Sequence, residues 1–70
     1  MQTFSLNGHK HIALCDLLKL TGLADSGGQA KTWIAESRVR RNGATETRKT
    51  AKIRAGEIIT LHGNELEIHA

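Results

Sequence analysis

The chain has 70 residues, 39% of them hydrophobic, and its ten Lys and Arg against seven Asp and Glu give a formal net charge of +3. A chain of this length forms one small domain whose core can rarely enclose a catalytic pocket, so an enzyme acting alone is not expected. The composition also excludes a disordered tail, and the single cysteine, Cys15, excludes an internal disulfide framework.

The N-terminal stretch MQTFSLNGHKHIAL has no apolar run long enough for a signal peptide or a membrane span. Together with the lone cysteine, this predicts a protein of the reducing cytoplasm that makes no contact with membranes. We expect residues 1–70 to fold as a single domain and to act as a monomer.

Basic residues are concentrated in the middle of the chain. Between residues 38 and 54, seven Lys and Arg stand against one acid, Glu46, so this stretch carries 7 − 1 = +6 and the rest of the chain carries −3. Such an asymmetry concentrates positive potential on one part of a small molecule and is typical of surfaces that bind polyanions. The basic residues of the stretch are Arg38, Arg40, Arg41, Arg48, Lys49, Lys52 and Arg54.

The first third of the chain predicts one strand and one helix. Polar and apolar residues alternate over Met1–Leu6, which indicates a short strand that ends at the turn residues Asn7 and Gly8. Apolar residues at three- and four-residue spacing predict a helix over Ile12–Leu20, and Gly22 stands where a left-handed C-cap would end it.

A second helix is predicted from Ser26 to about Glu36 or Ser37. The Ser26 hydroxyl can cap the free amides of the first turn, and Gln29, three residues later, completes a capping box. Because only a few residues join the two helices, they should pack as a tight corner. The inward stripe of the second helix consists of Ala30, Trp33 and Ile34.

From Val39 onward the pattern is extended. Asn42-Gly43 is a strong two-residue turn signal, because both positions accept positive φ, and it predicts a hairpin. Apolar and polar residues alternate from Lys52 to Ala70, with a further turn at Gly63-Asn64. The apolar positions of this segment are Ile53, Ile58, Ile59, Leu61, Leu66 and Ile68.

The run SGGQAKTWIAESRVRRNG and the order of the elements resemble the S-four-like, or αL, RNA-binding domain family, which is named after ribosomal small-subunit protein four. That family's pattern has a helix-capping Ser, an Ala four residues later, an apolar pair, then a Val, an Asn-Gly turn, and an apolar residue before a Gly-acidic pair. The match extends roughly from Leu14 to Leu61. In this chain the places are held by Ser26, Ala30, Trp33, Ile34, Val39, Asn42, Gly43, Ile53, Gly56 and Glu57.

Within the family, the chain is most similar to the short bacterial stand-alone proteins of the YbcJ type, because the opening TFSL, the segment LCDLLKL and the run ETRK look like theirs. The resemblance implies an α+β fold in which two short helices pack on a small, mostly antiparallel sheet. It also implies that RNA phosphates meet the second helix and the adjacent hairpin.

Three positions depart from the family pattern. Arg often follows the capping Ser, Gly often ends the helix, and an apolar residue often precedes Asn-Gly, where this chain has Gly27, Ser37 and Arg41. The missing arginine at position 27 removes one expected phosphate contact, and Arg41 adds charge nearby.

The basic residues are expected to form a continuous strip. On the second helix, Gly27, Lys31 and Arg38 share one flank, and the free amides at the helix N-terminus can receive a phosphate. Beyond the helix, Arg38 and Arg40 point to one side of an extended chain, and the hairpin folds the next basic segment back against them. Such a strip gives salt-dependent affinity, with selectivity coming mainly from RNA shape. The predicted RNA-binding residues are Ser26, Gly27, Gly28, Lys31, Arg38, Arg40, Arg41, Arg48, Lys49, Lys52 and Arg54.

Other candidate sites are weaker. A lone aromatic on an inward stripe, Trp33, is more often core than a base-stacking platform, and Phe4 is also expected in the core. Cys15 is expected to be a buried structural residue. A metal site formed by His9, His11 and Cys15 matches no common zinc spacing and lacks a fourth ligand.

No catalytic arrangement is recognisable in the sequence. Asp16 lies mid-helix and Asp25 lies at the entry to the second helix, so they do not form a paired-carboxylate site. His62 and His69 are expected at the surface, on strands. We therefore expect no catalytic residues, no metal and no cofactor.

The leading hypothesis is an RNA-binding module that docks folded RNA, ribosomal, transfer or other. The alternative is a small adaptor whose basic strip binds an acidic protein partner at the ribosome surface or within an RNA-processing assembly. An enzymatic role is the weakest hypothesis, because domains of this kind are often appended to RNA-modifying enzymes but this chain lacks the catalytic part.

Overall fold

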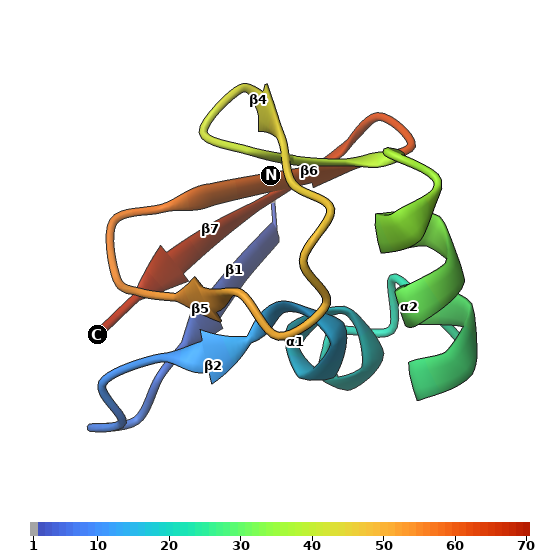
Figure 1. Ribbon diagram of the computed structural model, residues 1–70. Coiled ribbons are helices and arrows are strands. Elements are labelled where there is room, and N and C mark those ends of the chain that lie inside the picture. The colour runs from blue at the N-terminus through green and yellow to red at the C-terminus, as the bar shows by residue number, and fades with distance from the viewer. Residues whose placement is uncertain (1) are drawn as a thin grey trace.

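The computed structural model describes residues 2–70, in which two helices cover one face of a five-stranded sheet (Figure 1). The strand order is β1-β7-β6-β3-β4, and a separate two-stranded ribbon joins β2 to β5. Met1, the first residue of the predicted N-terminal strand, lies outside the described residues. The elements are β1 (Gln2–Ser5), β2 (Ile12–Ala13), α1 (Leu14–Leu20), α2 (Gly27–Ala35), β3 (Val39–Arg41), β4 (Ala44–Thr45), β5 (Lys52–Ile53), β6 (Ile58–Leu61) and β7 (Asn64–His69).

The sheet is mostly antiparallel, which confirms the predicted α+β architecture. β7 pairs with β6, β6 with β3 and β3 with β4 in antiparallel register, whereas β1 runs parallel to β7. The parallel pair places Phe4 opposite Ile68, so the first and last strands lie side by side.

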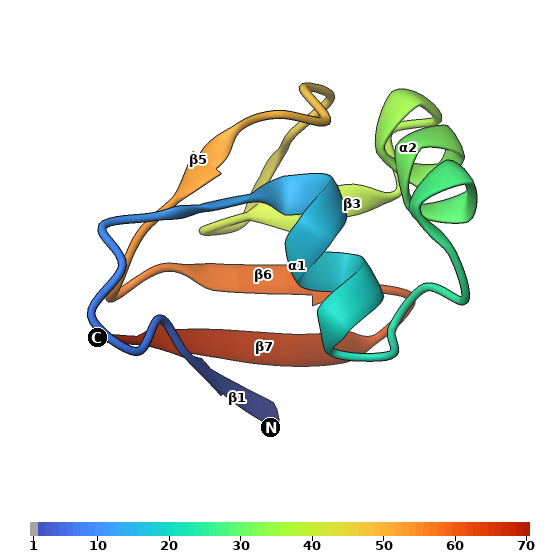
Figure 2. The same cartoon turned by 90° about the horizontal axis from the view of Figure 1, so that it is seen from below.

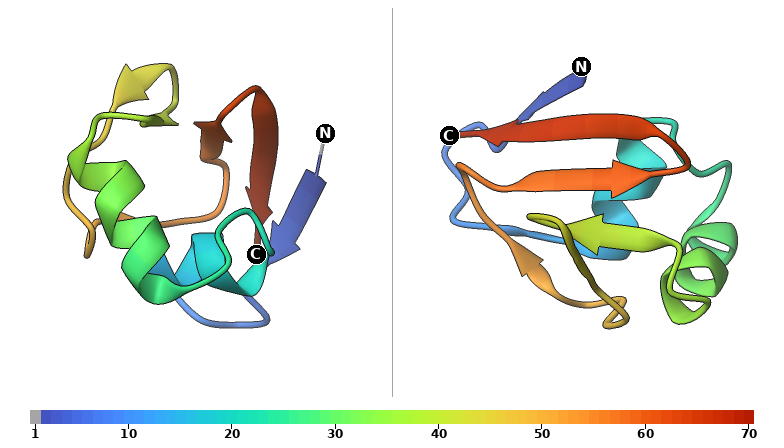
Figure 3. Two further views of the ribbon diagram at one scale, coloured as in Figure 1. Left: turned by 90° about the vertical axis from the view of Figure 1, so that its right-hand side faces the viewer. Right: turned by 90° about the horizontal axis from the view of Figure 1, so that it is seen from above.

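The hydrophobic core lies between the helices and the inner face of the sheet (Figures 2 and 3). Alternation along the strands turns every second side chain inward, and the apolar stripes of both helices face them. Neither helix in residues 2–70 has the length and apolar character needed to cross a membrane. The core side chains that are at most 1% exposed are those of Leu14, Leu17, Leu18, Ala30, Ile34, Val39, Ile53, Ile59, Leu61, Leu66 and Ile68.

The start of the first helix differs from the prediction. Ile12 and Ala13, expected in the helix, instead form β2 and pair with Ile53 and Lys52. The helix therefore begins at Leu14, and Ala13, its N-cap, offers no side-chain hydrogen bond. The extended conformation of Ile12 and Ala13 is favoured because their pairing with β5 buries Ile53. The chain then passes directly from β2 into α1. The predicted end is confirmed, since Gly22 follows the helix with φ +78°.

The second helix begins as predicted, with one change in its cap. The Ser26 hydroxyl accepts a hydrogen bond from the Gln29 amide at 3.1 Å. The Gln29 side chain, however, accepts from the Asp25 amide at 2.7 Å, not from that of Ser26. The reciprocal bond of a capping box is thus made one residue earlier.

One departure from the family pattern, Ser37, lies just after the end of α2. The helix ends at Ala35, slightly before the predicted Glu36 or Ser37. Ser37 has φ +63°, its amide donates to the Ile34 carbonyl, and the Arg38 amide donates to the Trp33 carbonyl. These two bonds form a Schellman motif, whose left-handed position normally holds glycine. Ser37 therefore occupies a place where a side chain is strained.

One predicted turn is confirmed and one is displaced. Asn42 and Gly43 have φ +52° and +85°, and they join β3 to β4 as expected. The turn predicted at Gly63-Asn64 is formed instead by His62 and Gly63, with Asn64 already paired in β7. At the other end of the β6–β7 hairpin, the Ile68 amide donates to the Glu57 carbonyl at 3.0 Å, and this bond helps to set the register of the two strands.

Replacing Ser37 with glycine should stabilise the protein. The substitution Ser37→Gly relieves the left-handed strain and should raise the free energy of unfolding by about 0.5–1 kcal/mol, after allowance for the greater freedom of glycine in the unfolded chain. Urea denaturation monitored by circular dichroism measures the change. The matched control is Ala35→Gly, in ordinary helical conformation, which should lower the same free energy by about 0.5–1 kcal/mol. Equal destabilisation by both substitutions would contradict the strain at Ser37.

Candidate nucleic-acid interface

A loop rich in basic residues crosses from the sheet to the first helix. We call residues 46–51 the basic loop; it runs between β4 and β5 and carries Arg48 and Lys49. In Figure 1 this segment is dark yellow, and Figures 1 and 2 place it on the same side of the molecule as α2. Both side chains are exposed, that of Arg48 by 73%.

The backbone of the basic loop is fixed by hydrogen bonds to α1. The carbonyls of Lys49 and Ala51 accept from the amides of Cys15 and Leu14, both at 3.0 Å. These amides belong to the first turn of α1, whose N–H groups lack partners within the helix. The basic loop therefore acts as the N-terminal cap that the sequence of α1 does not supply.

Arg41 is the centre of an ion-pair network behind this loop. Its Nε donates to Glu57 Oε1 at 2.5 Å and its Nη2 to Glu57 Oε2 at 3.1 Å, which is a bidentate pair. Its Nη1 donates to Glu46 Oε1 at 3.2 Å, and its Nη2 also donates to the Lys52 carbonyl at 2.9 Å. The side chain is 22% exposed. One guanidinium thus connects β3, the start of the basic loop, β5 and the start of β6.

Glu46 anchors the first turn of the basic loop. It accepts from Nε and Nη2 of Arg48, from the Arg48 amide and from Arg41. The hydrogen bond from the Arg48 side chain, then those from the Arg48 amide and Arg41, outweigh burial and lower the pKa of Glu46 from 4.5 to about 2. The carboxyl is therefore ionised in the folded state at neutral pH, and the fold favours this charged form.

Glu57 holds the other side of Arg41. Burial alone would raise the pKa of Glu57, but hydrogen bonds from Arg41, from the Arg54 amide and from Asn42 lower it overall. In turn, the bond to Glu57 contributes most to raising the pKa of Arg41. The pair is thus mutually stabilised in its charged form.

These contacts change the interpretation of Arg41. The sequence predicted that Arg41 adds free charge to an RNA-binding strip. Instead, its largely buried guanidinium is paired with two carboxylates and a carbonyl, so Arg41 is a structural cation of the fold. Where the family often has an apolar residue, this chain has an arginine whose charge is balanced by Glu46 and Glu57.

Lys31 lies on the flank of α2 that faces the basic loop. Ala30 and Ile34 are buried, and Trp33, on one flank, makes an edge contact with His62 of the β6–β7 turn, with ring centroids 4.8 Å apart. By the helical period, Lys31 falls on the opposite flank. The views in Figures 1 and 3 place the basic loop, rather than the β6–β7 turn, toward that side.

Arg40 points away from this surface. In β3 it stands between Val39 and Arg41, whose side chains face the core side, so it lies on the outer face of the sheet. Its partners in register are Thr45 and Thr60. The expectation that Arg40 continues a single strip is therefore wrong, because strand alternation places it on the other face.

The remaining basic side chains lie at the margins of the surface. Arg38, at the junction of α2 and β3, pairs with Glu36 at 2.7 Å, and both side chains are about half exposed. Lys52 and Arg54 are exposed, but Lys52 belongs to the β2–β5 ribbon and not to the β3–β4 hairpin. The segment that carries them leaves the hairpin instead of folding back against it, which is a second correction to the predicted strip.

The N-terminus of α2 is open, as the sequence indicated. An added Cβ at Gly27 would meet nothing within 4 Å, and one at Gly28 would meet only the Ser26 hydroxyl at 3.9 Å. Their amides begin the helix and precede the amide that Ser26 caps. Phosphate binding there stays a prediction.

The other candidate residues are placed as follows. Cys15 is buried, as predicted, and no group of three or more metal-ligating side chains occurs within residues 2–70. Phe4 and Trp33 are partly buried and pack against the core. His69 is on a strand as expected, whereas His62 occupies a turn.

The sequence interpretation missed the roles of the two glutamates. In the sequence, Glu46 is a lone acid within a basic stretch, and Glu57 belongs to the family pattern. A usable signal was present for Glu46, because Arg48 follows it by two residues. No local signal links Arg41 to Glu57, which is 16 residues away.

The Glu46 contacts predict how stability depends on pH. A carboxyl whose pKa is lower in the folded than in the unfolded state stabilises the fold above about pH 4.5, and this contribution is lost as the pH falls toward about 2. At neutral pH, Glu46→Gln should lower the free energy of unfolding by about 2–3 kcal/mol, and its curve should converge with that of the wild type near pH 2. Urea unfolding at stepped pH values measures both curves.

The control for this experiment is Glu65→Gln, at an exposed position of β7. Its pH profile should follow that of the wild type. Parallel profiles for the wild type and Glu46→Gln would show that Glu46 does not carry the expected linkage.

Comparison with known proteins places these features in a family. Residues 4–69 match the family described as the S4 domain. The chain is 51% identical, over all 70 residues of both chains, to "Putative RNA-binding protein YbcJ" of Escherichia coli K12 and equally to an uncharacterized protein YbcJ of Shigella flexneri. The solution structure of E. coli YbcJ, described as revealing an αL motif involved in RNA binding, is similar with a TM-score of 0.78 and 51% identity, covering all of this chain and 89% of that one.

The matched range contains both helices, the β3–β4 hairpin and the basic loop, which are the elements that form the surface described above. The resemblance seen in the sequence is therefore confirmed at the level of sequence and of structure. The chain belongs to the S4 domain family.

Proposed function

We propose that this protein is an RNA-binding module, and that it docks folded RNA through Lys31 of α2 and the basic loop with its neighbour Lys52. The observation that carries the proposal is the fixed position of the basic loop. The backbone of the loop is hydrogen-bonded to the first turn of α1, and the Glu46 side chain accepts a hydrogen bond from Arg41. An ordered backbone therefore presents Arg48 and Lys49 to solvent. Family membership and the names of the relatives support RNA as the polyanion.

An ordered cationic surface suits a folded RNA better than a flexible tail would. Because less conformational freedom is lost on binding, each phosphate contact contributes more to affinity. Contacts with phosphates carry no sequence information, so selectivity comes from the spacing of the phosphates and hence from RNA shape. Arg48 can take part although it pairs with Glu46, since a guanidinium has five donors and the Glu46 side chain uses two of its groups.

The wider setting belongs to the same proposal. Residues 1–70 would act as one RNA-binding domain and as a monomer, in the bacterial cytoplasm, where ribosomal and transfer RNA are found. An open N-terminus of α2, with Gly27 and Gly28, would add a backbone contact to one phosphate. No catalytic step is assigned to the protein.

Salt dependence of RNA binding tests the proposed surface. Fluorescence anisotropy with a labelled RNA hairpin, at several salt concentrations, gives the slope of log affinity against log salt. Lys31→Gln and Lys49→Gln should each weaken binding and reduce that slope by about 0.7–0.9, the value expected for one lost phosphate contact.

Arg40→Gln is the matched control, because it removes one positive charge from the outer face of the sheet. Its slope should equal that of the wild type. If Arg40→Gln reduces the slope as much as the other two substitutions, RNA lies on the outer face and the proposed surface is wrong. If the wild-type protein binds no RNA hairpin at low salt, the proposed function is wrong.

A further inference from the structure

Strand β1 forms one edge of the five-stranded sheet, and its outer side carries backbone groups that no strand within residues 2–70 pairs. The Leu6 amide donates to the His69 carbonyl at 2.9 Å, so Leu6 turns its N–H toward β7. Because successive residues of a strand point their N–H and C=O groups to opposite sides, Thr3 and Ser5 direct theirs away from the sheet. These four groups are available to an added strand.

The edge of β1 is unprotected and is held in a fixed position. Gln2–Ser5 contains neither proline nor a charged residue, which are common means of blocking strand addition. The Gln2 side chain donates to the Thr21 carbonyl, just after α1, at 3.1 Å, and the Ser5 hydroxyl donates to the Ala70 carbonyl at 3.0 Å. An incoming strand would therefore meet an ordered edge next to α1.

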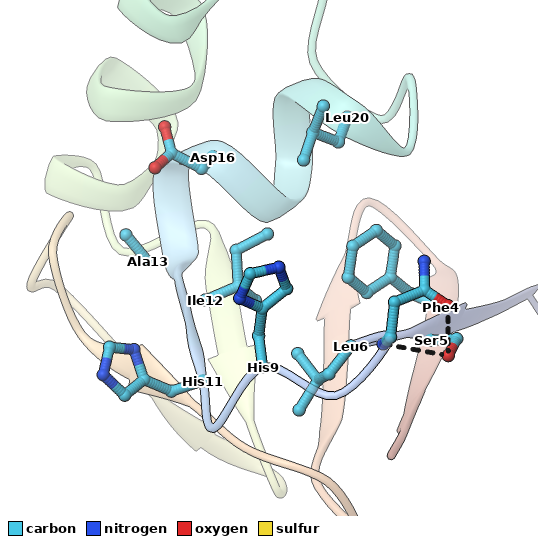
Figure 4. Close-up of a pocket in the computed structure, with 10 residues that line it drawn as sticks. Phe4, Ser5, Leu6, His9, His11, Ile12, Ala13, Asp16 and Leu20 are labelled. Carbon is cyan, nitrogen blue, oxygen red and sulfur yellow. Dashed lines mark hydrogen bonds between the residues drawn. The ribbon is translucent and has the colours of Figure 1, made fainter.

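A groove of about 520 Å³ lies beside this edge and is lined by residues of β1, the loop that follows it, β2 and α1. Figure 4 shows Phe4, His9 and Ile12 around the hollow, with Leu20 of α1 at its rim. Phe4 and Ile12 are partly buried, and Leu20, at 67%, is an exposed large hydrophobic residue. The groove thus offers an apolar surface to a further side chain.

The open edge and the groove suit the same occupant. A strand added to β1 would direct every second side chain to the face on which Phe4 packs, and hence toward the groove. Extended peptides bind other domains in this way, with main-chain hydrogen bonds to a sheet edge giving affinity and pockets for alternate side chains giving specificity.

The charge of the groove indicates the chemistry of the partner. Among the described residues that line it there is no Lys or Arg, and Asp16 is the one acid. Asp16 is exposed and belongs to none of the ion pairs found within residues 2–70. A Lys or Arg of the partner would complement it. The β1 strand of a second copy supplies no such group, and its Phe4 already packs against its own core.

We propose that the β1 edge and this groove bind an extended segment of a partner protein, which places an apolar side chain in the groove and a neighbouring Lys or Arg at Asp16. The proposal goes beyond RNA binding, because the groove shares no residue with the basic loop. The protein would then join a folded RNA to a protein that carries such a segment.

Selection from a phage-displayed library of random octapeptides on the wild-type protein supplies the probe. Enriched peptides should combine an apolar residue with Lys or Arg. In the NMR spectrum, a selected peptide should slow amide exchange at Thr3 and Ser5 at least tenfold and leave Phe4 and Leu6 unchanged, because strand addition protects only the outward amides. Failure to enrich any peptide, or unchanged exchange at Thr3 and Ser5, would overturn the proposal.

Methylated peptides test the backbone pairing without changing the protein. N-methyl groups on the alternate peptide amides that face β1 should abolish binding, whereas N-methyl groups on the other set should preserve it. Equal affinity of the two methylated forms would exclude strand addition.

Asp16→Asn should weaken peptide binding about two- to fivefold, as expected for loss of an exposed ion pair, and leave affinity for an RNA hairpin unchanged. Asp25→Asn, at an exposed acid outside the groove, is the matched control and should bind the peptide like the wild type. Equal weakening by both substitutions would contradict the role of Asp16.

Light scattering distinguishes a partner protein from a second copy. The wild type should remain monomeric at all concentrations. A dimer that forms with rising concentration and is lost in Thr3→Pro, which removes one outward amide, would assign the edge to a second copy and overturn the proposal.

Discussion

The guanidinium of Arg41, on β3, joins the five-stranded sheet to the β2–β5 ribbon and to the start of the basic loop. Its two carboxylate partners, Glu46 and Glu57, stand at the start of the basic loop and next to the first residue of β6, and its carbonyl partner, Lys52, begins β5. A partly buried charge of this kind stabilises the fold only when its partners are in place, and removing one member leaves the others unpaired at a cost of several kcal/mol. The position of the basic loop depends on this arrangement.

The cations of the middle segment differ in how far this network uses their charge. Arg41 is committed to the fold, and Arg48 divides its donors between Glu46 and solvent. Lys49 is exposed, and its backbone carbonyl is held by the Cys15 amide. The net charge of the segment therefore overstates the charge that can meet phosphates. Affinity then depends on a few well-placed side chains and on how firmly the loop holds them.

Local sequence patterns predicted the parts of the fold that depend on local physics. The cap at Ser26, the Asn42-Gly43 turn and the inward stripe of α2 follow from neighbouring residues, and the structure confirms them. The pairing of Arg41 with Glu57 joins residues far apart in the chain, so no periodicity reveals it. The predicted basic strip was wrong at Arg40 because residues of one charge were grouped by proximity in sequence, whereas a strand sends successive side chains to opposite faces.

Amide hydrogen exchange tests most directly whether Arg41 fixes the basic loop on α1. The amides of Leu14 and Cys15 donate to loop carbonyls, whereas the Leu6 amide donates to His69 at a distant edge of the sheet. In Arg41→Leu, exchange at Leu14 and Cys15 should accelerate at least tenfold more than at Leu6, because the loop detaches before the sheet opens. Equal acceleration at all three amides would show that the loop is held without Arg41, and would contradict the account.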